Sequence, residues 1–222
     1  MKNWKLLMWS VILAAISPGY ALGAPAADDS GWYVGLGVGR SDARRTTSWG
    51  GQTDASLLAN GITSSTVVSS HDTAWKLFAG YRFNENFAAE GGYTRIGRFA
   101  GTSVISAPAA ATAPGTWDAN ALSAAIVGIA PIAKQFSAFG KLGLAYSRLS
   151  VSVAAPGAGG TTVLVNPNNA RLQALVGAGL TYDVTKQFSV RTEWERFNNV
   201  GDGSTTGQTA IDVFSLSGQF RF

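Results

Sequence analysis

Charged side chains that stand opposite apolar ones are the residues of this 222-residue chain that could carry chemistry. Several segments alternate between an aliphatic or aromatic residue and a small or polar one, and seven charges occupy the polar side of that alternation. They are Lys76, Arg82, Glu90, Lys141, Arg191, Glu193 and Glu195. Nearby cations stabilise the ionised form of a carboxylate, so this arrangement favours ion pairing over acid catalysis by Glu90 and Glu193.

His71, the single histidine, is the other candidate for catalysis. It lies between Ser70 and Asp72, but adjacent residues of a strand point to opposite faces, so these three cannot form a triad by themselves. The chain has no cysteine, and its His, Asp and Glu residues show no metal-ligand spacing. We therefore expect neither catalytic residues nor a metal or cofactor, and we do not expect an enzyme.

An alternation with a period of two places these charges on β-strands. The clearest case is 175–202, which predicts two strands joined by a tight turn at 185–187. The same pattern predicts six further strands, at 32–40, 73–83, 87–96, 120–130, 136–147 and 211–222. The alternation is blurred across 124–127, so the sequence does not assign the two faces of the strand at 120–130.

The connections between the predicted strands alternate in length. Long linkers are expected at 41–71, 97–117, 149–169 and 198–209. Each short turn is followed by a phenylalanine, at Phe87, Phe136 and Phe188, which indicates a repeated hairpin unit. The predicted fold class is therefore all-β: an eight-stranded antiparallel up-and-down transmembrane β-barrel with short periplasmic turns and long extracellular loops.

The composition of the two faces decides between a membrane barrel and a soluble one. A soluble eight-stranded barrel such as a lipocalin turns its apolar face inward around a greasy ligand, whereas a membrane barrel turns it toward lipid. A soluble barrel would here expose the charges together with glycines such as Gly35, Gly37 and Gly177. Aromatic residues gather at the strand ends, as in the interfacial girdles of membrane barrels, so the pattern favours the membrane barrel.

Residues 1–23 have the features of a secretory signal peptide. Lys2 and Lys5 precede an apolar run, and the expected cleavage site is Ala21-Leu22-Gly23 or, as the alternative, Ala24-Pro25-Ala26. The barrel domain is then 24–222, exported to the outer membrane with both termini in the periplasm. Loss of the two lysines lowers the net charge from +4 to +2, and the other basic residues are scattered, so nucleic acid is not an expected partner.

Four segments carry a resemblance to a known family: GLTYDVTKQFSVRTEWERFNNVGD at 179–202, EGGYTRIG at 90–97, FGKLGLAYS at 139–147 and the terminal QFRF. They resemble the OmpA-like outer-membrane β-barrel. The resemblance implies an envelope-stabilising role with a narrow pore for small solutes, and a C-terminal Phe222 that the outer-membrane assembly machinery reads. Larger family members add a periplasmic peptidoglycan-binding domain, and because this chain ends at Phe222 we expect that function to be missing.

The charges are expected to meet inside the barrel. Glu90 and Arg191 each stand three residues after the phenylalanine of their turn, and Lys141 and Glu193 each stand five residues after theirs. Side chains nearly fill an eight-stranded barrel, and an unpaired charge at that depth costs several kcal/mol. The predicted lumen network consists of Glu90, Arg191, Glu193 and Lys141, with Lys76 and Glu195 nearer the cell surface.

Two interpretations fit such a network: a structural plug, or a gate that exchanges ion-pair partners. By resemblance, Glu90 and Arg191 match a salt bridge that closes the family's pore. The exchange partners would fall near Val127 and Thr181, which carry no charge here. A gate would then have to use the other two members of the predicted network.

The predicted surface loops offer a second candidate site. Arg44, Arg45, Trp49 and Arg98 are candidates for contacts with lipopolysaccharide phosphates or a host ligand, and the alternative is that they are only solvated. The expected partners are outer-membrane lipid and lipopolysaccharide, the assembly machinery, and a host ligand that the sequence does not identify. The alternative function to an envelope barrel is therefore a surface adhesion or host-interaction protein.

Overall fold

The computed structural model describes residues 30–157 and 160–222, so the signal peptide predicted at 1–23 lies outside the described residues. Ten strands and one helix occur in these two ranges. In chain order they are β1 (Gly31–Ala43), α2 (Thr46–Leu58), β2 (Thr63–Val68), β3 (His71–Arg82), β4 (Phe87–Ala107), β5 (Ala111–Ala133), β6 (Phe136–Pro156), β7 (Thr162–Val165), β8 (Asn168–Asp183), β9 (Phe188–Asp202) and β10 (Gly207–Arg221). Within the described part of the chain, no helix is long and apolar enough to span a membrane.

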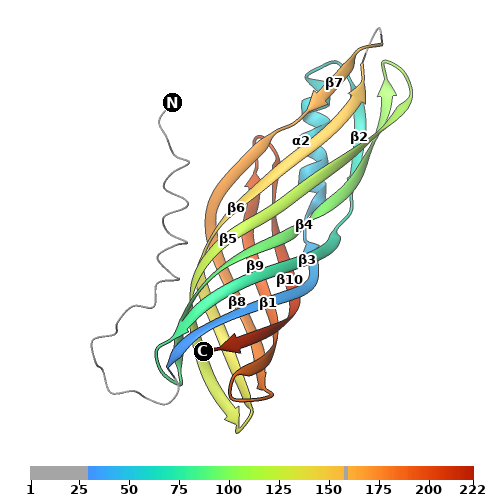
Figure 1. The fold of residues 1–222 in the computed structure, drawn as a ribbon. Coiled ribbons are helices and arrows are strands. Elements are labelled where there is room, and N and C mark those ends of the chain that lie inside the picture. The colour runs from blue at the N-terminus through green and yellow to red at the C-terminus, as the bar shows by residue number, and fades with distance from the viewer. Residues whose placement is uncertain (1–29, 158–159) are drawn as a thin grey trace.

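Eight of the strands close into a ring (Figure 1). Antiparallel ladders follow the order β1, β3, β4, β5, β6, β8, β9 and β10, and β10 pairs back with β1. Each of these strands overlaps one of the eight predicted ones, so the predicted antiparallel up-and-down barrel is confirmed. The two additional strands, β2 and β7, pair with the upper parts of β4 and β6.

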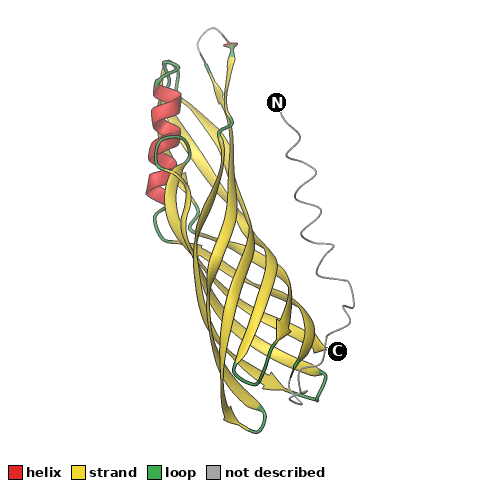
Figure 2. Cartoon of the chain, turned by 90° about the vertical axis from the view of Figure 1, so that its left-hand side faces the viewer, coloured by secondary structure: helices red, strands yellow, loops and turns green. Residues whose placement is uncertain are grey.

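The strands extend much further beyond the ring at one end of the barrel than at the other (Figures 1 and 2). Short turns at 83–86, 134–135 and 184–187 lie at one end, together with Phe222, and we call it the short-turn end. At the opposite end, the tall end, β4, β5 and β6 are 21, 23 and 21 residues long and rise beyond their neighbours. α2, β2 and β7 lie at the tall end.

The predicted long linkers are largely regular structure, and the prediction is wrong at 97–117 and 198–209. The β4–β5 ladder continues as far as Ile105 opposite Ala111, and β9 and β10 stay paired as far as Asp202 opposite Gly207. The other two predicted linkers, 41–71 and 149–169, contain α2, β2, the end of β6 and β7.

The strands continue because their alternation persists, but its polarity inverts partway along. On β6, Leu142 and Leu144 point outward and are more than half exposed, whereas Leu149 and Val151 further along point inward and are buried. Apolar side chains therefore face outward near the short-turn end and inward near the tall end. A prediction based on the apolar residues of one face therefore ends each strand at this inversion.

The outward apolar side chains cover the lower barrel, and we call this surface the lipid-facing band. Its exposed members include Trp32, Val34, Leu36, Val38, Trp75, Leu77, Leu142, Leu144, Leu180, Phe188, Phe214, Leu216 and Phe220. Exposing this many apolar side chains to water would be unfavourable in free energy, whereas contact with the hydrocarbon of a bilayer is favourable. The strand at 120–130, whose faces the sequence left open, exposes Ile126 and buries Val127.

The inward apolar side chains of the tall end pack into one cluster, which we call the upper core. Every strand of the ring contributes to it, and one member from each is Ala43, Ala74, Phe99, Trp117, Leu149, Leu175, Phe197 and Ile211. α2 adds Trp49 and Leu57, both fully buried, and the Trp49 ring lies 5.2 Å from the Phe99 ring. The upper core therefore spans the whole cross-section of the barrel.

Candidate functional site in the barrel lumen

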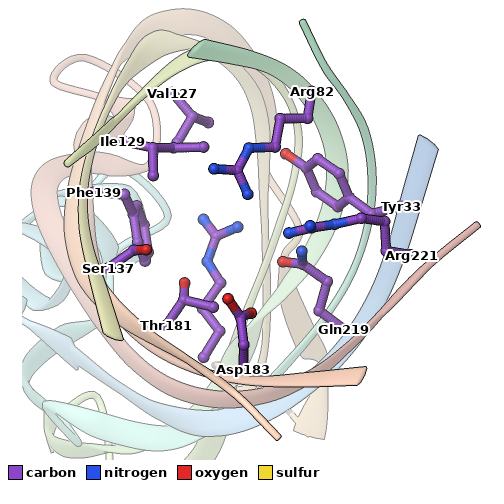
Figure 3. A pocket seen from close by; sticks show the side chains of 11 residues that line it. Tyr33, Arg82, Val127, Ile129, Ser137, Phe139, Thr181, Asp183, Gln219 and Arg221 are labelled. Atoms are coloured by element: carbon purple, nitrogen blue, oxygen red, sulfur yellow. The ribbon is translucent and has the colours of Figure 1, made fainter. Parts of the chain in front are cut away.

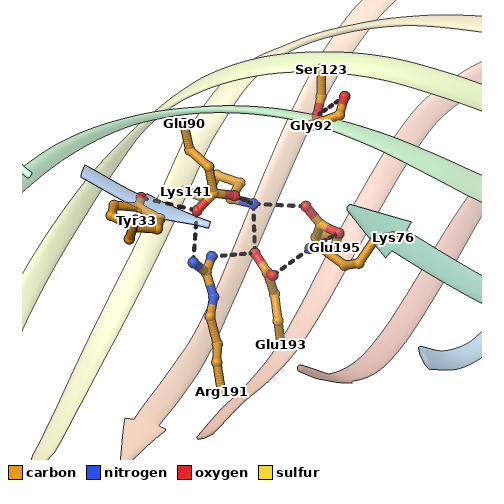
Figure 4. A network of polar contacts seen from close by, with 9 residues as sticks. All are labelled: Tyr33, Lys76, Glu90, Gly92, Ser123, Lys141, Arg191, Glu193 and Glu195. Carbon is orange, nitrogen blue, oxygen red and sulfur yellow. Dashed lines mark hydrogen bonds and ion pairs between the residues drawn. The ribbon is translucent and has the colours of Figure 1, made fainter. Parts of the chain in front are cut away.

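Six charged side chains meet in the lumen below the upper core, and we call them the charge network (Figure 4). β9 supplies three at alternate positions, since residues two apart on a strand share a face. β3, β4 and β6 each supply one. The members are Lys76, Glu90, Lys141, Arg191, Glu193 and Glu195, and none is more than 6% exposed.

Arg191 joins two of the carboxylates. Its Nη1 donates to Glu90 at 2.7 Å, and its Nη2 donates to Glu193 at 2.9 Å. The Tyr33 hydroxyl adds a hydrogen bond to Glu90 at 3.2 Å. A planar guanidinium holds two carboxylates in fixed directions, so Arg191 sets the geometry of this part of the network.

The two lysines complete the network. Lys141 Nζ contacts Glu90 and lies 2.8 Å from Glu193 and 2.9 Å from Glu195. Lys76 Nζ lies 2.5 Å from Glu193 and 2.6 Å from Glu195. Three cations therefore balance three anions, and the structure brings Lys76 and Glu195 into the same network as the four residues expected to meet.

Aromatic rings border the network on the side of the short-turn end. The Arg191 Cζ lies 3.9 Å from the centre of the Phe139 ring and 5.0 Å from that of Phe78, distances typical of cation–π contacts. Tyr33 and Val127 join these rings in a small buried cluster, which we call the aromatic collar. The collar narrows the lumen and packs against the guanidinium.

Below the collar, the lumen holds a cavity of about 40 Å³ (Figure 3). Arg82, Asp183, Gln219 and Arg221 are among the polar side chains that line it. It adjoins a wider mouth of about 410 Å³, which shares Arg82, Asp183 and Arg221. The short-turn end is thus polar and open, whereas the charge network and the upper core close the barrel above it.

The positions of the expected exchange partners carry no charge. Val127 belongs to the aromatic collar, and Thr181 lines the cavity. Lys141 and Glu193 contact each other, and across the lumen Lys141 reaches Glu90 on β4 and Glu193 reaches Lys76 on β3. The sequence pattern indicated these six charges, but it missed the upper core because most of that core lies in the segments predicted to be linkers.

The candidate loop residues are not gathered into one site. Trp49 was expected at the surface, and that expectation is wrong, because its indole packs in the upper core with no exposed area. Arg44 points to the outer wall and donates to Asp212 at 2.6 Å, and Arg98 donates to Asp118 at 3.0 Å. Arg45 is exposed, and its backbone N–H donates to a threonine hydroxyl at 2.8 Å.

Two further residues singled out by the sequence lie apart from the lumen. Phe222 is 74% exposed at the short-turn end, and its backbone N–H donates to the Trp32 carbonyl at 3.0 Å. His71 is exposed at the start of β3, where it pairs with Asp42 in the ladder. Within residues 30–157 and 160–222, no three His, Cys, Asp or Glu side chains lie together as metal ligands would.

Comparison with protein families places this architecture among known barrels. The family model of the OmpA-like transmembrane domain matches residues 26–222. Outer membrane protein A of Serratia marcescens is 25% identical over 215 residues, which cover 96% of this chain and 55% of that protein. The chain therefore spans about half the length of this curated relative.

Solved structures show the same fold at low sequence identity. The crystal structure of neisserial surface protein A superposes with a TM-score of 0.53 and 16% identity, covering 87% of this chain and 98% of the other. The outer membrane protein OprG from Pseudomonas aeruginosa gives a TM-score of 0.50 and 11% identity, covering 87% and 96%. At these identities the likeness concerns the fold.

Proposed function

The chain belongs to the OmpA-like transmembrane domain family and is an outer-membrane β-barrel, and from this premise we propose that it stabilises the cell envelope as a barrel closed at rest. In this proposal the short-turn end faces the periplasm and the tall end faces the outside. The orientation is supported by the contrast between short turns and tall hairpins, since outer-membrane barrels keep short turns on the periplasmic side.

Two closures in series carry the proposal. The charge network fills one level of the lumen with side chains at most 6% exposed, and the upper core fills the level above it with apolar side chains from all eight ring strands. Ions pass a closed hydrophobic constriction poorly, because they cannot shed their hydration there. The narrow pore implied by the resemblance would require both levels to open.

Conductance across planar bilayers tests this proposal. We expect no steady conductance from the wild-type barrel or from Glu90→Ala, because the upper core stays in place. A variant that combines Glu90→Ala with Trp49→Ala and Trp117→Ala opens space in both closures, and we expect it to conduct. Lys134→Ala at the short-turn end is the matched control.

Steady channels in the wild-type protein would overturn the proposal that the barrel is closed at rest. A combined variant that folds and does not conduct would instead contradict the assignment of the two closures. Folding is checked by the altered gel mobility of an intact barrel, so a folding failure is separated from a closed lumen.

A surface interaction role is the second candidate, favoured by one observation at the tall end. Val67 on β2 and Val104 on β4 are 72% and 55% exposed, and the ladder makes them diagonal neighbours beyond the lipid-facing band. Exposed apolar pairs on a folded surface are candidate partner contacts. Binding of cells to host tissue should fall with Val67→Ser/Val104→Ser if this role is real, and unchanged binding would remove it.

We infer no catalytic role for the His71 region. Asp72 already accepts a hydrogen bond from the Arg98 backbone N–H at 2.5 Å, and Ser70 lies on the opposite side of the histidine in the chain.

A further inference from the structure

An arginine occupies the same outward position on four strands. β1, β4, β6 and β9 all run from the short-turn end to the tall end, and on each the last residue of the lipid-facing band is followed two positions later by arginine. The pairs are Val38–Arg40, Tyr93–Arg95, Tyr146–Arg148 and Trp194–Arg196. Residues two apart share a face, so each arginine lies directly above a lipid-facing side chain.

Strand geometry gives three of these arginines a common height. Arg40, Arg95 and Arg196 each stand eight residues after an aromatic residue at the short-turn end, namely Trp32, Phe87 and Phe188. Eight residues extend about 26 Å at ~3.3 Å per residue, and strands tilted by roughly 40° climb about 20 Å. This height is close to the ~25 Å of an apolar band, so the arginines stand at its upper edge.

The fourth arginine, Arg148, stands twelve residues after Phe136, the aromatic residue of its own turn, so it lies further toward the tall end than the other three. The ladders place Arg148 in one row with Arg95, since both pair with Asn120. These four arginines and the flanking Arg44 and Arg98 form a set of six residues, which we call the arginine belt.

The belt carries more cations than its own carboxylates neutralise. Arg95 and Arg98 share Asp118, at 2.9 and 3.0 Å. Arg44 and Arg196 share Asp212, and Arg40 pairs with an exposed aspartate at 3.4 Å. Arg148 is exposed and has no ion pair among the described contacts.

Two arginines share Asp212 on the outer wall. Its carboxylate accepts hydrogen bonds from Arg196 at 2.7 and 3.1 Å and from Arg44 at 2.6 Å. The carboxylate therefore neutralises one of its two arginines and leaves a positive charge. The same two-to-one ratio holds at Asp118.

We propose that the arginine belt binds the phosphate groups of the glycolipid in the outer leaflet, with the acyl chains packed on the aromatic residues below. Guanidinium groups match phosphate in a bidentate geometry, and all six cations of the belt are arginine. The height shared by Arg40, Arg95 and Arg196 favours a ligand that is itself fixed at the membrane surface. The proposal rests on the orientation given above, because the reverse orientation would place the belt against phospholipid.

Lipid binding by the refolded barrel tests the proposal. The ligands are bisphosphorylated lipid A, dephosphorylated lipid A, phosphatidylglycerol and inorganic phosphate, each titrated against the barrel in a zwitterionic bilayer disc. We expect the barrel to prefer bisphosphorylated lipid A, and Arg95→Gln/Arg148→Gln to lose roughly tenfold affinity or more per arginine. Lys134→Gln/Lys186→Gln removes the same charge from the short-turn end and should bind as the wild type does.

Arg95→Lys/Arg148→Lys keeps the charge but not the planar fork, so intermediate binding would support bidentate recognition of phosphate. Equal binding of the dephosphorylated lipid, or wild-type affinity in the Gln variant, would overturn the proposal. Equal affinity for phosphatidylglycerol, or competition by inorganic phosphate at the same concentration, would overturn the assignment to the glycolipid. Protease access to the tall end on intact cells tests the orientation separately, so the two failures are distinguishable.

Discussion

Lys141 holds a central place in the charge network because it contacts all three carboxylates. An ammonium group has three N–H donors, so Glu90, Glu193 and Glu195 can each accept from one of them. Lys76 reaches only Glu193 and Glu195, and Arg191 reaches only Glu90 and Glu193. Loss of Lys141 would therefore leave three anions facing two cations in a buried lumen.

We expect Lys141→Met to lower the free energy of unfolding by about 3–5 kcal/mol, the range for removing one partner of a buried ion pair. Urea unfolding in lipid vesicles measures this change. Lys141→Met/Glu195→Gln restores the balance of charge and should recover part of the loss. Lys134→Met is the control, and a Lys141→Met barrel as stable as this control would contradict the account.

The residues of the network could be predicted from the sequence, and their joint arrangement could be predicted only in part. The alternation and the distance from each short turn indicated that Glu90 and Arg191 would meet. Lys76 and Glu195 were expected nearer the surface, but they join the network because strand tilt brings together residues at different distances from their turns. Tilt and register depend on the closed ring, which no single segment specifies.

Among the elements that the sequence did not predict, α2 is the one helix of the described residues. Its segment TTSWGGQTDASLL contains two glycines and few strong helix formers. Contacts with β2 hold it instead: Asp54 accepts hydrogen bonds from Ser64 and from the backbone and hydroxyl of Thr66. A Cβ at Gly50 would lie 2.4 Å from the Thr66 carbonyl oxygen, so the helix approaches the strand as closely as a glycine permits.

We expect Trp49→Ala to loosen the tall end without opening the ring. Truncation of a fully buried tryptophan costs about 3–5 kcal/mol, and the loss should fall on α2 and β2, which pack around it. Hydrogen exchange in bilayer discs should rise in these elements and stay low in the β1–β10 ladder. Leu58→Ala, at a side chain 62% exposed, is the control, and an unchanged α2 in Trp49→Ala would contradict the expectation.

The strand boundaries were predicted well at the short-turn end and poorly at the tall end. Phe87, Phe136 and Phe188 each begin a strand as expected. At the other end, the expected strands stop near Ile96 and Ser147, whereas β4 and β6 continue to Ala107 and Pro156. Alternation alone cannot tell which face meets lipid, so a strand that passes from one solvent into another looks as though it ends.

The whole molecule is built for two solvents. Its lower half turns apolar side chains toward lipid and charges inward, whereas its upper half turns apolar side chains inward as a water-soluble protein does. Urea is dissolved in the water and not in the hydrocarbon of the bilayer, so it weakens hydrophobic burial mainly in the half of the protein that water surrounds. The two halves should therefore differ in their response to denaturant.

In bilayer discs we expect moderate urea to raise hydrogen exchange in α2, β2 and β7 before it affects the ladders of the lipid-facing band. The reason is that these three elements lie at the tall end and contribute no ladder to the ring. Exchange followed by mass spectrometry at increasing urea measures the order of opening. A single transition shared by β7 and the β1–β10 ladder would show that the halves unfold together.

The upper core also determines when the barrel stops leaking during its assembly. All eight strands of the ring contribute a side chain to it, and the β1–β10 ladder is the one that brings the two ends of the ring together. An incomplete ring thus has no seal, whatever the order in which its hairpins arrive. Closing the last ladder and shutting the permeation route are one event, driven by the burial of the same side chains.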